Sequence, residues 1–486
     1  MAAASPAEPH SESFNDRSYA DWLARAEAKM AAKAKPPGSL GTLETLACRL
    51  AALQHTLEPR VGRTYLLVFG ADHGITAARP EISAYPRQVS APIFKAIVRG
   101  QAASAVLCAA NALTALLAVD VGLDADVTGV QPPPPLTGLE EPAWSRKPQI
   151  AVLHRKVRPQ GSRNMLEGPA MTEEELAAAL QAGADAVQTA VRGRPGPAGA
   201  EQGCAVHEGS GSGNGDVGNS SGGGGGCAGR GDALPDDWRR CVLCIGEVGI
   251  GNTTAAAALL AALTGASPED VCGRGTGVDD AGLAAKRAAV EAALAANEGL
   301  LAAGGGGGGG GALRALRAVG GLELAGMAGA VLEAARLGLP VVADGFISGC
   351  AALAALAHQP RPVGRVLLLS HRSAERGAAV LLAALTGATP LAPHVAAHQQ
   401  QEQERQEQEQ QEQGAQQEPH QQEAAVAAAA AGGGIARAGP CARPTPAVLD
   451  MGMRLGEGTG AVLVLPLLRA AVAVLRDMAS LEQVLA

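Results

Sequence analysis

The sequence predicts an α/β fold in which a mainly parallel sheet is covered by helices on both faces. Two observations support this prediction. Short runs rich in Val, Leu and Ile recur along the chain, and helical stretches separate most of them. The runs are apolar almost throughout and do not alternate with polar residues, which is typical of parallel strands buried on both faces.

The expected elements follow one another from the N-terminus. An amphipathic segment over 19–34 indicates a first helix, the prolines of KPPGSLG (35–41) end it, and LETLACRLAAL (43–53) indicates a second. Beyond these, apolar runs predict the strands and periodic Ala/Leu-rich stretches predict the helices. The expected strands are 64–70, 115–122, 149–153, 241–246, 339–345 and 364–370, and the expected helices are 91–110, 173–191, 254–264, 279–297 and 374–384.

Three segments have the composition of insertions. A Gly/Ser-rich stretch (193–236), a polyglycine loop (304–311) and a Gln/Glu-rich stretch (392–446) contain too little apolar material to bury, so we expect mobile loops there. The remaining chain divides around them. We expect a disordered start (1–17), a helical part (18–64), two parts of the α/β domain (65–192 and 237–391), and a catalytic segment with a C-terminal helix (447–486).

Composition narrows the class of protein. The net charge of −8, without a basic stripe or interleaved aromatic residues, argues against a nucleic-acid partner. No uninterrupted run of about 18 apolar residues predicts a membrane span. Cys241 and Cys244 have the spacing of a redox or zinc pair, but their apolar surroundings favour two inert core thiols, and we expect no metal. The start lacks the apolar region of a signal peptide, so we expect a cytoplasmic protein and leave an organelle open.

Polar residues follow the predicted strands where a parallel sheet would bind a ligand. In open α/β sheets the site lies beyond the carboxyl ends of the strands. A polar side chain at each of five strand ends therefore predicts an active site at this edge. The residues concerned are Asp72, His73, Asp124, Glu247, Ser348, His371, Arg372 and Ser373.

The stretch GEVGIGNTT joins a predicted strand to a helix through a glycine-rich loop. Gly249 and Gly251 allow close backbone approach, and Asn252, Thr253 and Thr254 offer caps and N–H donors at the helix start. The loop lacks the lysine of an ATPase phosphate loop, so a monophosphate ester is the better ligand. A tight strand–helix turn with an ordinary cap is the alternative.

A second glycine-rich loop, GRGTGVDD, precedes the helix expected over 279–297. Gly275 and Gly277 lie in this loop, and Asp279 is placed to cap the helix. Lys286 lies about two turns inside that helix. It is either a solvated side chain or a contact for the same anion.

Two acids in glycine-rich turns, Glu247 and Glu457, are the best candidates for acid–base or charge-stabilising work. The glycines beside Glu457, Gly456 and Gly458, suit close approach by a ligand, whereas an acid at a helix N-terminus is the simpler structural reading. No signature of a serine hydrolase, zinc protease or kinase is present.

Nine motifs then occur in one order: KPPGSLGTLETLA, ADHGI with SAYP, EGPAMT, GEVGIGNTTAAAAL, GRGTGVDDAGLAAK, GGLELAGMAGAVLEAAR, VVADGFIS, SHRSAERGA and MGMRLGEGTGA. Together they closely resemble the nicotinate-nucleotide–dimethylbenzimidazole phosphoribosyltransferase family. The resemblance implies a doubly wound, Rossmann-like domain, a smaller helical domain built from distant segments, and a homodimer. It also implies transfer of phosphoribose from nicotinate mononucleotide to 5,6-dimethylbenzimidazole without a metal or redox cofactor.

The resemblance also implies roles for matched residues. The acid of the R-L-G-E-G motif, Glu457, would be the general base, and Glu247 would orient the ribose or stabilise charge at C1′. The two glycine loops with Lys286 would hold the phosphate. The remaining expected substrate contacts are Asp72, Tyr85, Ile93, Ser370, His371, Arg454, Leu455 and Gly456.

Two alternatives stay open at this point. Tyr85 and Ile93 stand where some relatives carry small or amide residues, so one alternative is a different acceptor, adenine or another benzimidazole, in place of dimethylbenzimidazole. The other alternative is a non-catalytic protein that binds α-ribazole or benzimidazoles. Retention of both acids argues against it, since apolar binding needs neither.

Overall fold

The computed structural model describes residues 16–132, 148–192, 234–235, 237–303, 310–396 and 443–486. The expected disordered start lies outside the described residues except for its last two positions. The expected insertions lie outside them over 193–233, 236, 304–309 and 397–442.

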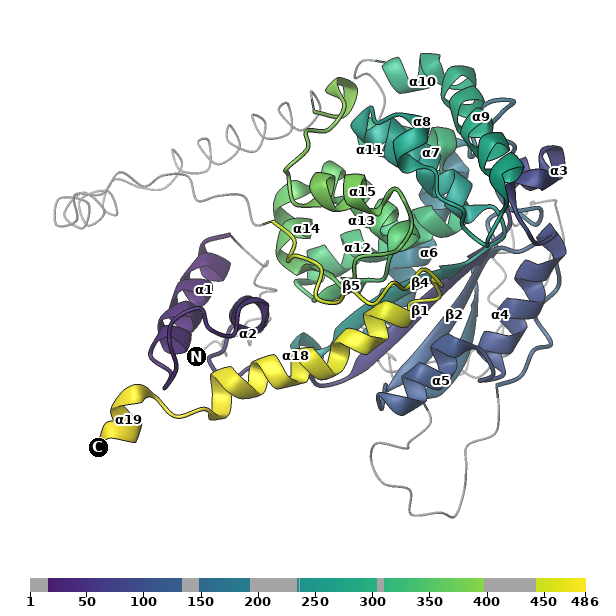
Figure 1. The fold of residues 1–486 in the computed structure, drawn as a ribbon. Helices are drawn as coiled ribbons and strands as arrows, with labels where there is room; N and C mark the ends of the chain where they lie inside the picture. Colours follow the sequence, from purple (N-terminus) through teal and green to yellow (C-terminus); the bar gives the residue numbers. More distant parts are fainter. Residues whose placement is uncertain (1–15, 133–147, 193–233, 236, 304–309, 397–442) are drawn as a thin grey trace, which may run out of the picture.

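A six-stranded parallel sheet forms the centre of the described chain, as the apolar runs predict (Figure 1). The strand order is β3-β2-β1-β4-β5-β6, so the chain winds outward from β1 and then returns to build the other half. This is the doubly wound order of a Rossmann-like sheet, with its switch point between β1 and β4. The strands are β1 (Thr64–Ala71), β2 (Ala115–Gly122), β3 (Gln149–His154), β4 (Val242–Val248), β5 (Val341–Ala343) and β6 (Leu367–Leu369).

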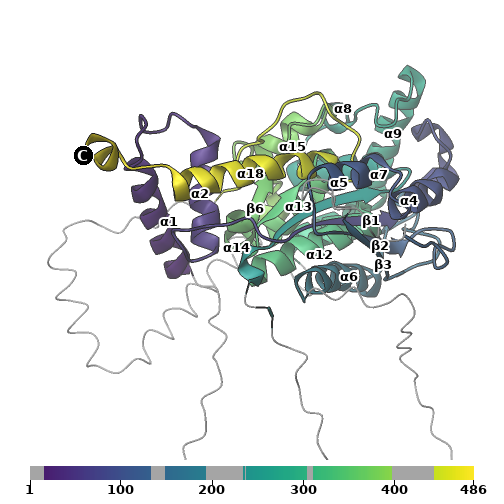
Figure 2. The ribbon, with the colours of Figure 1, turned by 90° about the horizontal axis from the view of Figure 1, so that it is seen from below.

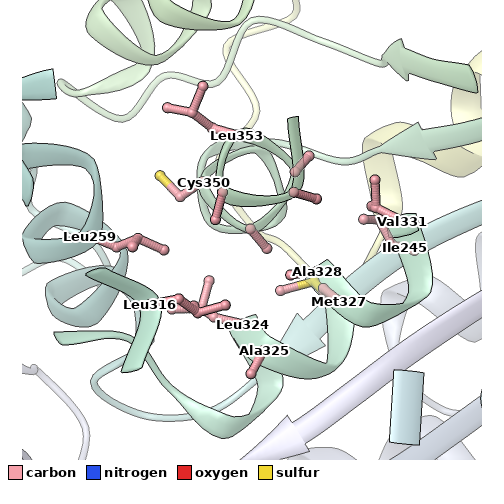
Figure 3. Close-up of a cluster of buried hydrophobic side chains, with 14 of the residues drawn as sticks. Ile245, Leu259, Leu316, Leu324, Ala325, Met327, Ala328, Val331, Cys350 and Leu353 are labelled. Carbon is pink, nitrogen blue, oxygen red and sulfur yellow. The ribbon is translucent and has the colours of Figure 1, made fainter. Parts of the chain in front are cut away.

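Helices cover both faces of the sheet (Figure 2). Leu67 and Phe69 of β1 belong to a core shared with α6, α7, α11, α12 and α13, whereas Leu66 and Val68 belong to a second core shared with α2, α4, α5 and α18. The alternation follows from the period of two in a strand. Figure 3 shows part of the first core, in which Ile245 of β4 and Cys350 of α13 lie among Leu and Ala side chains.

The helices and short 3-10 turns have the following bounds. They are α1 (Asp16–Ala31), α2 (Thr42–Leu53), α3 (Ile75–Ala78), η1 (Pro80–Ile82), η2 (Arg87–Val89), α4 (Ser90–Val98), α5 (Ala103–Ala110), α6 (Glu173–Arg192), η4 (Trp238–Arg240), α7 (Asn252–Thr264), α8 (Pro268–Val271), α9 (Asp280–Ala296), α10 (Glu298–Ala302), α11 (Gly311–Val319), α12 (Leu322–Leu337), α13 (Phe346–His358), α14 (Pro360–Val366), α15 (Ala378–Leu385), α18 (Thr459–Asp477) and α19 (Leu481–Leu485).

The structure corrects the sequence prediction at two helices and one strand. The single helix expected over 91–110 is two helices, because Gly100 adopts a left-handed φ of 74° after α4. The strand expected over 364–370 is reduced to β6, because α14 continues to Val366. The helix expected from residue 254 begins two residues earlier, and left-handed Gly251 (φ 101°) precedes it.

The two ends of the described chain meet in one helical unit. α1 and α2 pack beside α18, which runs from the sheet edge to this unit (Figure 1). Lys33, after α1, forms a bridge with Ser480, and its Nζ donates to the carbonyl oxygen of Met478 at 2.5 Å. A smaller helical unit is therefore built from segments that are distant in sequence.

Within the part of the chain that the structure describes, two helical stretches, 87–110 and 459–477, are long and apolar enough to cross a membrane by length and composition alone. The second is α18, and 56% of its apolar window is buried inside the protein. Its buried face, which includes Leu465 and Leu468, belongs to the second core. This packing gives α18 the surroundings of a core helix.

Both thiols of the CVLC pair are fully buried. Cys241 and Cys244 are free, and burial raises the pKa of Cys241 to about 11 and that of Cys244 well above its ordinary value. A thiol is reactive or metal-binding as the thiolate, which burial disfavours here. The interpretation as core residues is confirmed.

α6 and α12 pack closely against each other, and one glycine on each helix, Gly183 of α6 and Gly329 of α12, allows it. A Cβ atom at Gly329 would collide with the carbonyl oxygen of Leu180, and one at Gly183 would collide with that of Gly326. The backbones therefore touch directly. Larger residues would push the helices apart.

We expect Gly329→Ala to lower the free energy of unfolding by about 1–3 kcal/mol, because the new methyl group overpacks this contact. Urea denaturation of the purified protein measures the change. Gly299→Ala on α10 is the matched control, since nothing lies within 4 Å of its added Cβ, and it should be neutral or slightly stabilising. Equal effects of the two substitutions would contradict the account.

Candidate active site

A pocket with about 290 Å³ of empty volume lies at the carboxyl ends of β4, β5 and β6. Its wall brings together segments that are far apart in the chain: Glu247 ends β4, Asp344 follows β5, and His371 follows β6. Thr253 of α7 and Arg454 of the C-terminal segment complete the wall. The position matches the strand-end site that the polar residues predict.

The segment that carries Glu457 has an unusual backbone. Gly456, Glu457 and Gly458 have φ angles of 88°, 59° and 80°, so three consecutive residues are left-handed. For a residue with a side chain this conformation costs about 1–2 kcal/mol. The surrounding structure must therefore hold Glu457 in place.

The glycines beside Glu457 allow this segment to lie directly on the sheet edge. A Cβ at Gly456 would collide with Oε1 of Glu247, one at Gly458 with the side chain of Leu66, and one at Gly460 with the ring of His371. Gly246 of β4 similarly makes room for the backbone of Gly458. The sequence interpretation, in which these glycines make room for a ligand, is therefore corrected: the protein's own atoms fill the space.

Asp344 anchors the N-terminus of α18 to the sheet. Its Oδ1 accepts hydrogen bonds from the backbone N–H groups of Gly460 (2.7 Å) and Ala461 (3.2 Å), and its Oδ2 accepts one from Gly458 (3.1 Å). α18 has no side-chain cap of its own, because the residue before it is Gly458. Asp344 thus supplies the cap from β5 and binds both ends of the turn that follows Glu457.

The carboxylate of Glu457 contacts the start of α5. Oε2 accepts a hydrogen bond from the Ser104 hydroxyl at 2.9 Å, and the backbone N–H of the same residue lies 3.5 Å from that oxygen. Ser104 is fully buried, and Glu457 is 9% exposed. The carboxylate is thus held through Oε2.

Glu247 is crowded by other acids. Burial raises its pKa well above the ordinary value, the charges of Glu323, Asp344 and Glu457 raise it further, and the N–H of Glu457 opposes the shift. Its Oε2 accepts a hydrogen bond from the side-chain amide of Asn252. Burial also raises the pKa of Asp344 to about 7, against the opposing effect of its three N–H donors. The pocket therefore favours a positively charged ligand.

The two glycine-rich loops meet at Lys286. Its Nζ donates to Oγ1 of Thr253 at 2.9 Å, and Gly275 leaves room beside both atoms. Burial lowers the pKa of Lys286, while the charge of Glu375 opposes the change. A cation with a hydroxyl and two helix starts nearby is suited to an anion. The structure thus brings Thr253, Gly275 and Lys286 together, as the sequence predicts.

Other parts of the first loop are less free than the sequence suggests. The N–H groups of Asn252 and Thr254 donate to the carbonyls of Gly249 and Gly251, and the Thr254 side chain is fully buried. Gly249 and Gly251 pack against residues 71–76, where a Cβ at either position would collide with the chain. Asp279 caps α9 by accepting from the N–H of Gly282, as expected. Gly277 is left-handed, with open space beside it.

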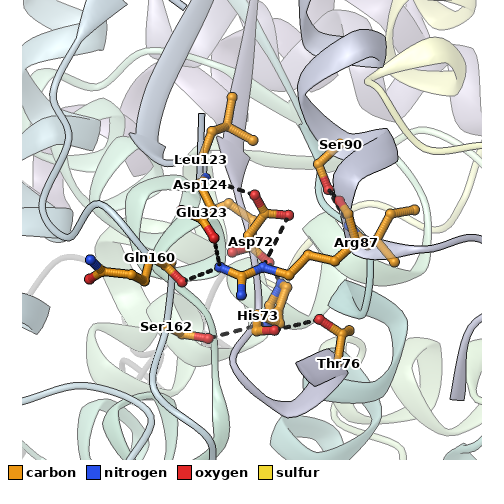
Figure 4. A network of polar contacts seen from close by, with 12 residues as sticks. Asp72, His73, Thr76, Arg87, Ser90, Leu123, Asp124, Gln160, Ser162 and Glu323 are labelled. Carbon is orange, nitrogen blue, oxygen red and sulfur yellow. Dashed lines mark hydrogen bonds and ion pairs between the residues drawn. The ribbon is translucent and has the colours of Figure 1, made fainter. Parts of the chain in front are cut away.

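Asp72 belongs to a different polar network at the ends of β1 and β2 (Figure 4). Its Oδ2 accepts from the N–H of Asp124, and Arg87 bridges the two acids, with its guanidinium 3.0 Å from Asp124 and 3.9 Å from Asp72. His73 forms a buried pair with Glu323, its Nε2 2.8 Å from Oε1. Asp72 is not among the residues that line the Glu247 pocket.

Of the remaining expected substrate contacts, some are buried behind the pocket wall and others are exposed at the protein surface. Ser370 is fully buried and donates to the carbonyl oxygen of Asp344, so it supports the wall. Tyr85 and Leu455 are more than half exposed, and Ile93 is partly buried on α4 against the second core.

Three functional candidates were not predicted: Ser104, Asp344 and Glu323. Asp344 follows the predicted strand of VVADG, so the strand-end position that marks Asp72 and Glu247 also marks this residue. Ser104 and Glu323 occur in apolar or Ala-rich stretches, and only the packing shows their partners. Among the described residues, no group of three or more His, Cys, Asp or Glu side chains is arranged to hold a metal ion.

Comparisons with known proteins give a consistent result. A family model described as a phosphoribosyltransferase matches residues 16–195, 235–395 and 442–484. The nicotinate-nucleotide–dimethylbenzimidazole phosphoribosyltransferase of Chromobacterium violaceum is 36% identical over 94% of both chains, and that of Thermus thermophilus is 35% identical over 95% of this chain and 97% of its own. A crystal structure of the Thermus thermophilus enzyme superposes with a TM-score of 0.61 at 32% identity, covering 96% and 98% of the two chains.

The raised pKa of Asp344 predicts a pH dependence of stability. The folded chain holds this proton up to about pH 7, whereas the unfolded chain releases it near 3.8. The folded state therefore binds more protons between pH 4 and 7, and its stability falls as pH rises through that window. Asn cannot ionise, so Asp344→Asn should lack this pH dependence. We expect the difference in unfolding free energy, wild type minus Asp344→Asn, to decrease by about 4 kcal/mol between pH 4 and pH 8.

Urea denaturation of both proteins across this pH range measures the difference, in which titrations common to both cancel. A difference that is constant with pH would show that Asp344 ionises normally in the folded protein.

Proposed function

The chain belongs to the nicotinate-nucleotide–dimethylbenzimidazole phosphoribosyltransferase family, and from this premise we propose its reaction and the roles of its residues. It transfers the 5-phosphoribosyl group of nicotinate mononucleotide to 5,6-dimethylbenzimidazole. The products are α-ribazole 5′-phosphate and nicotinate. The transfer activates dimethylbenzimidazole as the lower ligand of cobalamin. The observation that carries the proposal is a buried, anchored carboxylate, Glu457, which directly follows the pocket residue Gly456. On another wall of that pocket, Thr253 accepts a hydrogen bond from Lys286.

Glu457 is the general base. One ring nitrogen of the benzimidazole attacks C1′ of the ribose, and the bond from C1′ to the pyridinium nitrogen breaks. The electron pair of that bond stays on nicotinate, which leaves as a neutral pyridine ring and needs no general acid. The proton on the other benzimidazole nitrogen passes to Glu457, and attack opposite the leaving group inverts the β-glycoside to α.

Glu247 acts on the positive charge at the reacting carbon. Its carboxyl group lies against Gly456 and accepts from Asn252, so its position is fixed. A cationic pyridinium or an electron-poor C1′ nearby favours the ionised form of this acid. Charge that develops in the transition state is thereby stabilised by a group that is already in place.

The phosphate binds beside the pocket wall at Thr253, on Lys286 and the loop around Gly275. Lys286 is buried, and its ammonium group donates a hydrogen bond to Thr253. A phosphate would provide the counter-charge. The rim residue Arg454 is exposed and lines the same pocket, so it adds a second cation.

Two further features extend the proposal. We place the reaction in the cytoplasm, and we propose that the working form is a homodimer. Exposed apolar side chains flank the catalytic segment, with Met451 61% and Leu455 59% exposed, and a second subunit would cover such a surface. Light scattering of the purified protein tests the dimer.

We expect Glu457→Gln to lower kcat by roughly two or more orders of magnitude, because the amide cannot accept the benzimidazole proton. Chromatography of α-ribazole 5′-phosphate, formed from nicotinate mononucleotide and dimethylbenzimidazole, measures the rate. Glu482→Gln on α19 is the control and should be fully active. A Glu457→Gln enzyme with unchanged kcat would exclude the general base, and an inactive wild type would exclude this acceptor.

We expect Lys286→Met to raise the KM for nicotinate mononucleotide by about 10–100-fold, because a charge-assisted hydrogen bond to the phosphate is lost. The KM for dimethylbenzimidazole should stay within about twofold of the wild-type value. Initial rates with each substrate varied in turn separate the two constants. Lys29→Met, in the helical unit, is the matched control, and a KM effect shared equally by both substrates would contradict the assignment.

A further inference from the structure

We propose that Ser104 is a positioning residue for the general base: it holds one oxygen of Glu457 and leaves the other for the acceptor's N–H. The inference rests on the proposed function, because it assigns the geometry of the same base. Ser104 does not line the Glu247 pocket, and no motif in the sequence marks it.

Both hydrogen-bonding groups of Ser104 point at one carboxylate oxygen. The hydroxyl lies 2.9 Å and the backbone nitrogen 3.5 Å from Oε2 of Glu457. Ser104 is the second residue of α5, so the positive end of that helix also faces the acid. Among the described residues, no hydrogen bond is formed with Oε1. One oxygen is therefore anchored and the other is available to a ligand.

The hydrogen bond from Ser104 determines the direction of the Glu457 carboxylate, which the backbone alone does not fix. Asp344 fixes the turn after Glu457 through backbone contacts, but it touches none of the rotatable bonds of the Glu457 side chain. The charge of Glu457 raises the pKa of the neighbouring acid Glu247, so the two carboxyl groups lie close together. A fully buried hydroxyl 353 residues away in the chain supplies the fixed donor. General-base catalysis depends on such fixed geometry, because the proton transfers over a single hydrogen bond.

A purely structural role is the competing explanation. The residue before α5, Ala102, offers no side-chain cap, so Glu457 also caps this helix. In that case loss of the hydroxyl would lower stability without a specific effect on turnover. The two roles differ in kcat and in their dependence on the Glu457 carboxylate.

The first test compares Ser104→Ala with Ser104→Thr in the full chain. We expect Ser104→Ala to lower kcat by about 10–100-fold while the KM values for both substrates stay within about twofold. Ser104→Thr keeps the hydroxyl and should recover most of the rate. Thr64→Val, which removes a buried hydroxyl at the opposite end of β1, is the matched control and should keep the wild-type kcat.

The second test is a double-mutant cycle with Glu457→Gln, which does not depend on the fit of threonine. If Ser104 works through the carboxylate, then adding Ser104→Ala to Glu457→Gln changes the residual rate by less than about twofold. Fully additive losses would overturn the proposal, as would a Ser104→Ala enzyme of normal kcat. An inactive wild type would instead remove the proposed function, and the Ser104 inference with it.

Discussion

The cap that Asp344 places on the N-terminus of α18 is the interaction on which the site depends. It joins the end of β5 to a segment more than 110 residues later, and three backbone N–H groups converge on one carboxylate. The turn that carries Glu457 is left-handed at three consecutive residues, a conformation that would relax without such an attachment. The sheet edge thereby determines where Glu457, the proposed general base, lies, although this residue belongs to no strand.

The charges of the pocket follow from the same arrangement. Because the C-terminal segment packs on the sheet edge, Glu457 lies next to Glu247 and Asp344. Burial raises the pKa of both Glu247 and Asp344. Three neighbouring acids are unfavourable in the empty protein, but they suit the proposed substrate, which carries a pyridinium cation. The buried Lys286 at the other loop suits the phosphate of that substrate. In the proposed function, the acids thus lie at the pyridinium end of the mononucleotide and Lys286 at its phosphate end.

Sequence reasoning succeeded where the signal is local. The six apolar runs correspond to the six strands, because buried parallel strands have a composition that needs no partner to be identified. Glu247, Thr253 and Lys286 were found because strand ends and glycine-rich loops mark them. The α4–α5 break was missed because one glycine in an Ala-rich stretch is a weak stop signal.

The support of the site could not be predicted, because it consists of long-range contacts. Ser104 meets Glu457 across 353 residues, and nothing around Ser104 distinguishes it from other serines. The sequence shows the glycines near Glu457 and suggests that they make room for a ligand. Only the fold shows that Glu247, Leu66 and His371 fill that space. The sequence prediction placed Asp72 in the pocket because it follows a strand. In the structure Asp72 lies on the other side of the switch point from Glu247 and interacts with Arg87.

The most direct test of the general base is a crystal structure of Glu457→Gln with nicotinate mononucleotide and dimethylbenzimidazole bound. The account predicts that one benzimidazole nitrogen lies within about 3.2 Å of the residue 457 side chain, with the other facing C1′. It also predicts the phosphate beside Lys286. A benzimidazole seated elsewhere, with residue 457 out of hydrogen-bond reach of both ring nitrogens, would contradict the central claim.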